Sequence, residues 1–253
     1  MGEDKQQTVV VTGGTKGIGL DIVRAFLEQG ARVFAGARGK SEDFETNAPG
    51  AVFVKTDVRH REEVRALVAR AAADSGGVDV MVNNAGVSIW KTLRGIDEEF
   101  VDLLFDTNLK GAFWGSQAAA DHMPEGGVII NVASLAGKRG SANNSVYCAS
   151  KFGMVGLTQA LAKELGPRQI RVNGVCPVYV NTDSLLSSLS GDHPEVGEMD
   201  PQAFLDQWGA KSAALQRLPT GGECAALCVY LAGDAASAIT GQNINVDCGV
   251  LPQ

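Results

Sequence analysis

A tyrosine and a lysine four residues apart, Tyr147 and Lys151, are well suited to acid–base chemistry. On a helix this spacing places both side chains on one face, side by side. A phenol with an ordinary pKa of about 10 exchanges protons poorly at neutral pH, and a neighbouring ammonium brings that pKa toward the working range. Ser134 follows an apolar run at 128–133, so a buried strand could deliver its hydroxyl to the same place. The Tyr/Lys spacing alone is common on solvated helix faces, but the three residues together predict a proton-transfer site.

A glycine-rich turn near the N-terminus predicts a site for the pyrophosphate of a dinucleotide. A β-branched run at 8–11 leads into Gly13, Gly17 and Gly19, and helical periodicity then runs to Gly30. A strand, a turn and a helix in this order direct free backbone N–H groups and a positive dipole end at a bound anion. Three residues rather than one separate the first two glycines, unlike the usual fingerprint, and such turns also occur without a ligand.

Five separated motifs resemble those of the short-chain dehydrogenase/reductase family in order and spacing. They are Thr12-Gly13-x-x-x-Gly17-x-Gly19, Asn83-Asn84-Ala85-Gly86, Asn108, Ser134 and Tyr147-x-x-x-Lys151, and the likeness continues to the segment 241–249. The resemblance implies an α/β protein with a single-domain Rossmann fold, in which a doubly wound seven-stranded parallel sheet carries helices on both faces.

Composition limits the class of protein. At 253 residues with 45% hydrophobic and 20% charged residues, the chain fits one soluble domain over 1–253. The N-terminal segment is polar and no apolar run approaches the length of a membrane span, so we expect a cytoplasmic protein. A net charge of −7 argues against a nucleic-acid-binding face. Five scattered cysteines and three separated histidines indicate buried thiols and surface imidazoles rather than disulfides or a metal site.

Apolar runs and helical segments alternate along the chain, which predicts a parallel sheet covered on both sides. We expect strands at 8–11, 32–35, 52–55, 80–82, 128–132, 171–175 and 243–246, and helices at 17–29, 61–74, 98–123, 146–165 and 221–231. The segment 183–216 breaks this rhythm with turn residues around short amphipathic pieces. An excursion of this kind near the strand ends is typical of a substrate lid.

The family resemblance implies a catalytic tetrad. In it, Tyr147 exchanges a proton with the substrate oxygen while a hydride moves to or from the nicotinamide, and Lys151 lowers the tyrosine pKa and holds the nicotinamide ribose. Ser134 orients the reacting oxygen, and Asn108 supports a water-linked proton path to the lysine. A buried amide bonded to backbone at a helix irregularity would also explain Asn108. No metal is expected, since the nicotinamide supplies the redox chemistry.

The resemblance also implies a dinucleotide lying along the glycine turn and the strand ends. Asp57 matches the family position that meets the adenine ring, although acids there are also common as helix caps. Val178 stands where the family often has glycine, and it disfavours the positive φ that glycine allows. The expected cofactor-binding residues are Gly13, Thr15, Lys16, Gly17, Ile18, Gly19, Arg38, Asp57, Val58, Asn84, Ala85, Gly86, Tyr147, Lys151, Pro177, Val180 and Thr182.

Charge at the end of the second strand favours NADP(H) over NAD(H). Ala37 stands where NAD-preferring enzymes of this kind usually carry an acid that bonds the ribose 2′-hydroxyl. Arg38 follows it, and Lys16 precedes the second glycine of the turn. Two cations and no anion suit a 2′-phosphate, although both could be ordinary surface charges, and NAD(H) stays an alternative.

The expected substrate is a small alcohol or ketone bound by Ser134, Trp90, Asn144 and Tyr179 under the lid. The lid and the segment after it resemble members that act on polyols, sugars and vicinal diols or hydroxyketones. One alternative is a 3-oxoacyl-thioester reductase of lipid synthesis, which would need a basic docking patch for its acidic carrier. An alternative of another class is a non-catalytic dinucleotide-binding sensor, against which the intact Ser134, Tyr147 and Lys151 argue.

Two of the expected helices, 98–123 and 146–165, carry more apolar residues than packing on one sheet face usually needs. In the family such helices commonly pair between subunits. The sequence therefore predicts a homo-oligomer, a tetramer or a dimer.

Overall fold

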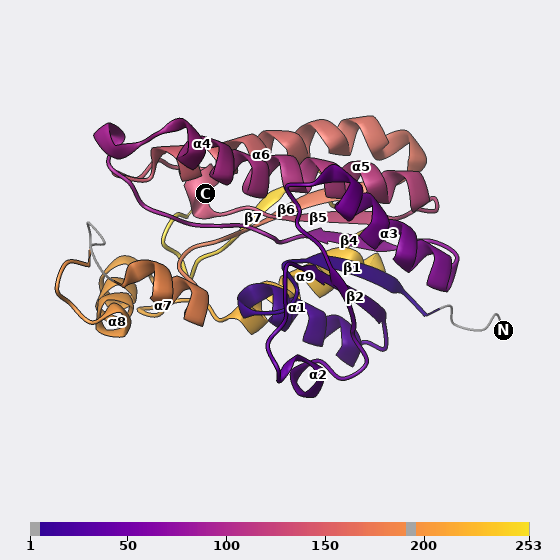
Figure 1. Cartoon of the computed structure of the whole chain (residues 1–253), viewed down its shortest axis with the longest axis horizontal. Helices are drawn as coiled ribbons and strands as arrows, with labels where there is room; N and C mark the ends of the chain where they lie inside the picture. Colours follow the sequence, from indigo (N-terminus) through magenta and orange to yellow (C-terminus); the bar gives the residue numbers. More distant parts are fainter. Residues whose placement is uncertain (1–5, 191–195, 253) are drawn as a thin grey trace.

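Seven parallel strands form the central sheet of the computed structural model, which describes residues 6–190 and 196–252 (Figure 1). The strands are β1 (Thr8–Thr12), β2 (Arg32–Ala37), β3 (Val52–Lys55), β4 (Val80–Asn83), β5 (Val128–Val132), β6 (Arg171–Pro177) and β7 (Asn243–Val246). Their order is β3-β2-β1-β4-β5-β6-β7. The prediction of a doubly wound, seven-stranded parallel sheet is confirmed, and four strands end one or two residues later than predicted.

Helices cover both faces of the sheet (Figure 1). One layer holds α1 (Gly17–Glu28), the short α2 (Phe44–Asn47) and α9 (Gly221–Ala232), and the other holds α3 (Arg61–Ser75), α4 (Glu98–Phe105), α5 (Gly111–His122) and α6 (Ser145–Leu165). The strand order reverses between β1 and β4. In open α/β sheets, ligands bind outside the carboxyl ends of the strands at such a switch point.

The strands are apolar on both faces because each face packs on helices. Alternate residues of β1 separate accordingly: Val9 and Val11 belong to the core on the α1/α9 side, and Val10 belongs to the core on the α3/α5 side. All three side chains are fully buried. The continuous β-branched character of these strands therefore reflects two cores rather than one.

The predicted helix at 98–123 contains a π-helical turn, Asp106–Lys110, between α4 and α5. A π turn holds one extra residue, so the helical period changes there. Buried residues lie on both sides of the turn, in α4 and in α5. Sequence periodicity alone gave one uninterrupted helix. The interruption falls on Asn108, whose side chain is completely buried.

The segment predicted as a lid forms two helices, α7 (Asp183–Leu189) and α8 (Pro201–Ser212), at one end of the molecule (Figure 1). These helices are longer than the short amphipathic pieces expected from the sequence. They have a small core of their own around Leu189, Val196 and Leu205. Asp200 caps α8 by accepting a hydrogen bond from the backbone N–H of Ala203.

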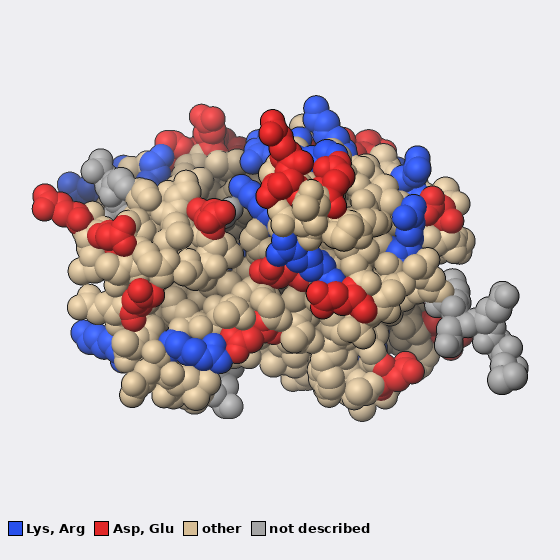
Figure 2. Space-filling view, turned by 90° about the horizontal axis from the view of Figure 1, so that it is seen from below, with Lys and Arg blue, Asp and Glu red and all other residues tan. Residues whose placement is uncertain are grey.

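The cysteines and histidines within the described residues form no disulfide and no group of metal-ligand type. Cys148, Cys176, Cys224 and Cys228 are buried, as predicted, whereas Cys248 is half-buried. His60 and His122 are exposed, and His193 lies outside the described residues. Basic and acidic side chains are interspersed on the face that Figure 2 shows. Across 6–190 and 196–252, no helix has the length and apolar character needed to cross a membrane.

Candidate active site

A cavity of about 1130 Å³ lies at the carboxyl ends of the strands, bounded on one side by the lid helices. It brings together residues from the glycine turn, the loops after β2, β4, β5 and β6, the start of α6, and α7 and α8. The predicted site residues that line it are Thr15, Lys16, Gly17, Ile18, Arg38, Gly86, Trp90, Ser134, Asn144, Tyr147, Tyr179, Val180 and Thr182.

Other predicted site residues do not line this cavity: Gly13, Gly19, Asp57, Val58, Asn84, Ala85, Asn108, Lys151 and Pro177. Most of them contact residues that do, and they support its wall from behind. Asp57 and Val58 differ, because their side chains contact Arg59 and the start of α5 instead.

The glycine turn is shaped for close approach of a ligand. Gly13 and Gly17 have φ values of 65° and 53°, which glycine adopts without strain. A Cβ at Gly19 would lie 2.2 Å from the carbonyl oxygen of Gly13, so only glycine fits there. Asn84 braces the turn, since its Nδ2 donates to the carbonyl oxygens of Thr12 at 2.9 Å and Gly13 at 3.2 Å.

The start of α1 fits the pyrophosphate of a dinucleotide. Within the described chain, no side chain caps this helix and its first turn contains no acid. Its first N–H groups are therefore left for an anion, and the helix dipole favours negative charge there. Thr15 holds the loop in place by donating a hydrogen bond to the carbonyl oxygen of Gly39 at 3.0 Å.

Lys16 and Arg38 are two exposed cations on the cavity wall. Neither forms an ion pair or a side-chain hydrogen bond with another residue in the part of the chain that the structure describes. The nearby Lys40, by contrast, is paired with Glu45. Their charges are thus uncompensated, which suits an anionic ligand such as a 2′-phosphate.

Asp57 is held by Arg59. The Arg59 Nη2 lies 2.6 Å from Oδ2 of Asp57, and the backbone N–H of Arg59 donates to Oδ1 at 3.0 Å. These hydrogen bonds lower the pKa of Asp57 to about 2. Val58 is buried and packs against the start of α5, where a Cβ at Gly111 would come within 2.9 Å of it.

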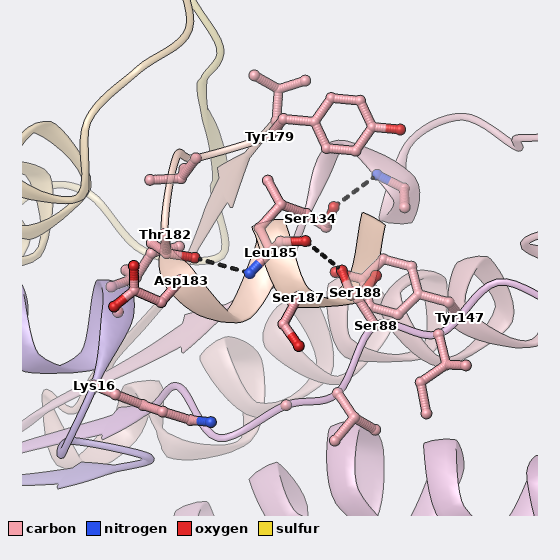
Figure 3. Close-up of a pocket in the computed structure, with 18 of the residues that line it drawn as sticks. Lys16, Ser88, Ser134, Tyr147, Tyr179, Thr182, Asp183, Leu185, Ser187 and Ser188 are labelled. Carbon is pink, nitrogen blue, oxygen red and sulfur yellow. Dashed lines mark hydrogen bonds between the residues drawn. The ribbon is translucent and has the colours of Figure 1, made fainter. Parts of the chain in front are cut away.

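Tyr147 and Ser134 bring two hydroxyl groups to the cavity wall (Figure 3). Ser134 lies just after β5, where its Oγ accepts from the backbone N–H of Ala136 at 3.1 Å and is 3.5 Å from the carbonyl oxygen of Pro177. Burial raises the pKa of Tyr147, and a hydrogen bond with Ser134 partly offsets that effect. Both hydroxyls can therefore address one oxygen atom of a bound substrate.

Lys151 is buried behind Tyr147. Its Nζ donates to the carbonyl oxygen of Val132 at 2.8 Å and lies 5.8 Å from the centre of the Tyr147 ring. Burial lowers the pKa of Lys151 to about 8. The sequence predicted that Lys151 lowers the tyrosine pKa. In the structure burial has the largest effect on this group, so the pKa of Tyr147 is raised.

Asn108 connects three parts of the site from within the π turn. Its Oδ1 accepts from the backbone N–H of Val87 at 2.8 Å, and its Nδ2 donates to the carbonyl oxygen of Val87 at 3.0 Å and to Oγ of Ser150 at 3.1 Å. Ser150 in turn donates to the carbonyl oxygen of Tyr147 at 2.8 Å. Asn108 therefore fixes the loop after β4 against the helix that carries Tyr147.

The chain after β6 replaces the family's glycine without strain. Val178 is absent from the residues with positive φ, and its N–H donates to the carbonyl oxygen of Val246 at 3.3 Å. The valine thus continues the sheet pairing and adds a side chain to the cavity wall. Thr182 caps α7 through Leu185 and packs against Gly17, so the lid meets the glycine turn.

Several cavity residues were not anticipated as individuals. Ser41, Asp43 and Asn47 come from the loop before α2 and from α2 itself, and Trp208 comes from α8. Ser187 and Ser188 come from α7 (Figure 3). The 4.9 Å edge-on contact between Trp208 and Tyr179 was not foreseen either. A four-residue helix and a lid without regular periodicity leave little sequence signal for which side chains face inward.

Comparisons with known proteins agree with this geometry. A family model described as enoyl-(acyl carrier protein) reductase matches residues 13–251. The chain is 39% identical to the putative ketoacyl reductase of the monensin polyketide synthase from Streptomyces virginiae, over 99% of both chains. It is 33% identical to galactitol 2-dehydrogenase from Agrobacterium fabrum, over 96% of both. A solved actinorhodin polyketide ketoreductase variant with NADPH matches 99% of both chains, with a TM-score of 0.89 at 33% identity.

Proposed function

The chain belongs to the short-chain dehydrogenase/reductase family, and from this premise we propose that it interconverts a secondary alcohol and a ketone with NADP(H) as cofactor. The observation that carries the proposal is the cavity wall that Ser134 and Tyr147 share, with Lys151 buried behind Tyr147 and the glycine turn at the other end of the cavity. A purely binding protein would not need two hydroxyls and a buried amine at that point, which argues against a non-catalytic sensor.

The protein's residues divide the work between proton transfer and orientation. Tyr147 donates its phenolic proton to the substrate oxygen as a ketone is reduced, and removes that proton in the reverse direction. Ser134 holds the same oxygen by a hydrogen bond. Lys151 is the buried cation that stabilises the phenolate left after proton transfer, and Asn108 keeps α6 and the loop after β4 in register.

The residues present fit a nicotinamide dinucleotide, which supplies the hydride when it is bound. The glycine turn and the uncapped start of α1 would hold the pyrophosphate. Lys16 and Arg38 would bind a 2′-phosphate, and the occurrence of NADPH in a similar ketoreductase structure supports this preference. Gly86, Val180 and Thr182 would border the nicotinamide half. The carboxylate of Asp57 is bound to Arg59 and its backbone N–H donates to Glu63 at 2.8 Å, so contact with the adenine would compete with these partners.

We propose an oxygen-rich substrate of the polyol, sugar or vicinal diol and hydroxyketone class. Hydroxyl and amide groups on the cavity wall support this choice, among them Ser88, Ser141, Asn144, Ser187 and Ser188. The similarity to galactitol 2-dehydrogenase agrees with it. A second candidate is reduction of a ketoacyl substrate, favoured by the 39% identity to a putative ketoacyl reductase and by the apolar side chains of Ile89, Val178 and Trp208 on the same wall.

Steady-state rates of NADPH oxidation with fructose, acetoin and acetoacetyl-coenzyme A would test the proposal, with the Tyr147→Phe variant as control. We expect the hydroxylated ketones to give the higher kcat/KM. Turnover of the thioester alone would favour the second candidate. Activity in the tyrosine variant equal to that of the parent enzyme would overturn the proposed chemistry.

We further propose that the enzyme is a homo-oligomer assembled through α5 and α6. Phe113 and Phe152 project from these helices with exposed fractions of 42% and 47%, and aromatic residues so exposed are common in subunit interfaces. Sedimentation at micromolar concentration is expected to show a dimer or tetramer. A monomer at the working concentration would refute this arrangement.

A further inference from the structure

Asn144 immediately precedes α6, the helix that carries Tyr147, and its side chain does not cap that helix. Asparagine before a helix normally accepts a hydrogen bond from a backbone N–H in the first turn. At the start of α6, the part of the chain that the structure describes contains no such side-chain bond. The residue therefore forgoes the interaction that usually explains an asparagine at this position.

The Oδ1 atom of Asn144 is buried without a hydrogen-bond partner among the described residues. The side chain is only 4% exposed, and a buried acceptor left unpaired is costly. Asn144 also borders the cavity that holds Ser134 and Tyr147. A rotation about χ2, which is a soft torsion, can present the amide to that cavity, so a bound ligand is the available source of a donor.

The residue before it is also held in an unusual conformation. Asn143 has a φ of 56°, in the left-handed region that non-glycine residues seldom adopt. Its carbonyl oxygen accepts from the backbone N–H of Lys91 at 2.8 Å, which joins the start of α6 to the loop after β4. Asparagine enters this region more readily than most residues, and at ligand sites the surrounding structure can fix such backbone.

From these observations we propose that Asn144 is a specificity residue whose Oδ1 accepts a hydrogen bond from a hydroxyl group on the carbon next to the reacting carbonyl. Asn144 precedes Tyr147 by three residues, an axial distance of about 4.5 Å in a helix. A hydroxyl on the neighbouring carbon of a ketone held by Tyr147 lies within that range. The inference rests on the proposed function and narrows its substrate class to vicinal hydroxyketones and the corresponding diols.

Three ketones that share one phenyl group test the proposal: 2-hydroxyacetophenone, 2-methoxyacetophenone and propiophenone. The methoxy compound keeps the electron-withdrawing oxygen but has no donor, and propiophenone keeps the shape without the oxygen. For the parent enzyme we expect kcat/KM for the hydroxy ketone to exceed that for the methoxy ketone by about tenfold. In Asn144→Leu this ratio is expected to fall to about one, whereas Asn144→Asp, which keeps an acceptor, retains a preference.

Thermal unfolding separates specificity from a structural role. Because the side chain neither caps the helix nor pairs with another group, Asn144→Leu is expected to unfold at the parent temperature or slightly above it. Calorimetric binding of 1-phenylethane-1,2-diol and its 2-methyl ether to the enzyme with NADPH, which cannot accept a hydride from an alcohol, gives the same comparison without turnover. Absence of NADPH-linked turnover for all three ketones would contradict the proposed function. An unchanged preference for the hydroxyl compound in Asn144→Leu, in rate or in binding, would overturn the role of Asn144.

Discussion

Cofactor preference offers the sharpest test of the charge argument at the end of β2. Arg38 and Lys16 border the cavity, and neither has a charged or hydrogen-bonded partner among residues 6–190 and 196–252. Replacing Arg38 with alanine removes one cation expected to meet the 2′-phosphate of NADPH. The change leaves the pairing of β2 with β1 and β3 intact, because the strand ends at Ala37.

The expected change in the KM for NADPH follows from the solvent exposure of Arg38. A hydrogen bond to a charged group contributes about 1.5–3 kcal/mol, and solvent screening of an exposed pair reduces this to roughly 1 kcal/mol. A factor of ten corresponds to about 1.4 kcal/mol. We therefore expect the KM for NADPH to rise about five- to tenfold in Arg38→Ala, with the KM for NADH unchanged. The parent preference for NADPH should shrink further when the salt concentration is raised, since exposed charges are screened.

The matched control is Lys40→Ala, which removes a cation two residues away whose charge is already paired with Glu45. This variant is expected to keep the parent values for both cofactors. Initial rates over a range of NADPH and NADH concentrations, at fixed ketone concentration, give the KM of each variant for each cofactor. Equal changes toward both cofactors in Arg38→Ala, or a similar loss in the control, would refute the assignment of a 2′-phosphate site.

The other predictions concern catalysis and stability. Tyr147→Phe is expected to lower kcat by about 10²–10⁴-fold while NADPH still binds, as followed by its fluorescence; retained turnover would contradict a role in proton transfer. Asn108→Leu leaves both backbone groups of Val87 without their side-chain partner, so we expect a loss of about 3 kcal/mol and a fall in Tm of about 6–12 °C. Ser150→Ala removes the hydrogen bonds from Asn108 and to the carbonyl oxygen of Tyr147 but leaves both groups of Val87 paired, so it should cost less, and equal losses in the two variants would count against this account. The pKa of Asp57 is lowered from its ordinary 3.8 to about 2, so its ionised form stabilises the fold above about pH 4 and that contribution fades as the pH falls toward 2. The Tm difference between the parent and Asp57→Asn should narrow over this interval, and a constant difference would show that the carboxylate charge is not its source.

The sheet could be predicted from the sequence because its signals are local and repeated. Val9-Val10-Val11, for example, is short, β-branched and followed by a glycine turn, and in the structure it is buried on both faces of the sheet. The strand ends were the least certain. Prediction stopped at Ala35 in β2 and at Val175 in β6, whereas pairing continues to Ala37 and Pro177, because small or mixed residues at these ends stay in the sheet by backbone hydrogen bonding alone.

The residues of the chemical site could be placed because their spacing is tied to fixed elements. Tyr147 and Lys151 share α6, and Ser134 follows β5 directly. Residues whose position depends on side-chain competition could not be placed in this way. Asp57 carries the sequence pattern expected at the adenine, and in the structure its carboxylate is bound by Arg59, two residues away. The sequence pattern does not show which of these partners the carboxylate contacts.

The relation between Tyr147 and Lys151 shows why a motif does not specify a protonation state. The spacing of the two residues predicts a lowered tyrosine pKa, because an ammonium attracts a phenolate. Burial acts in the opposite direction on the same group, because it disfavours the charged form, and it acts on the lysine as well. In the structure the pKa of Lys151 falls to about 8. Near that pH the lysine is partly uncharged, so it stabilises the tyrosine phenolate less. A pH profile of kcat/KM for ketone reduction is therefore expected to lose activity as the pH rises through this range, since Lys151 then loses its charge. The Lys151→Arg variant, whose charge persists at every accessible pH, is the informative comparison. If residual activity in that variant falls over the same interval as in the parent, the titration belongs to another group.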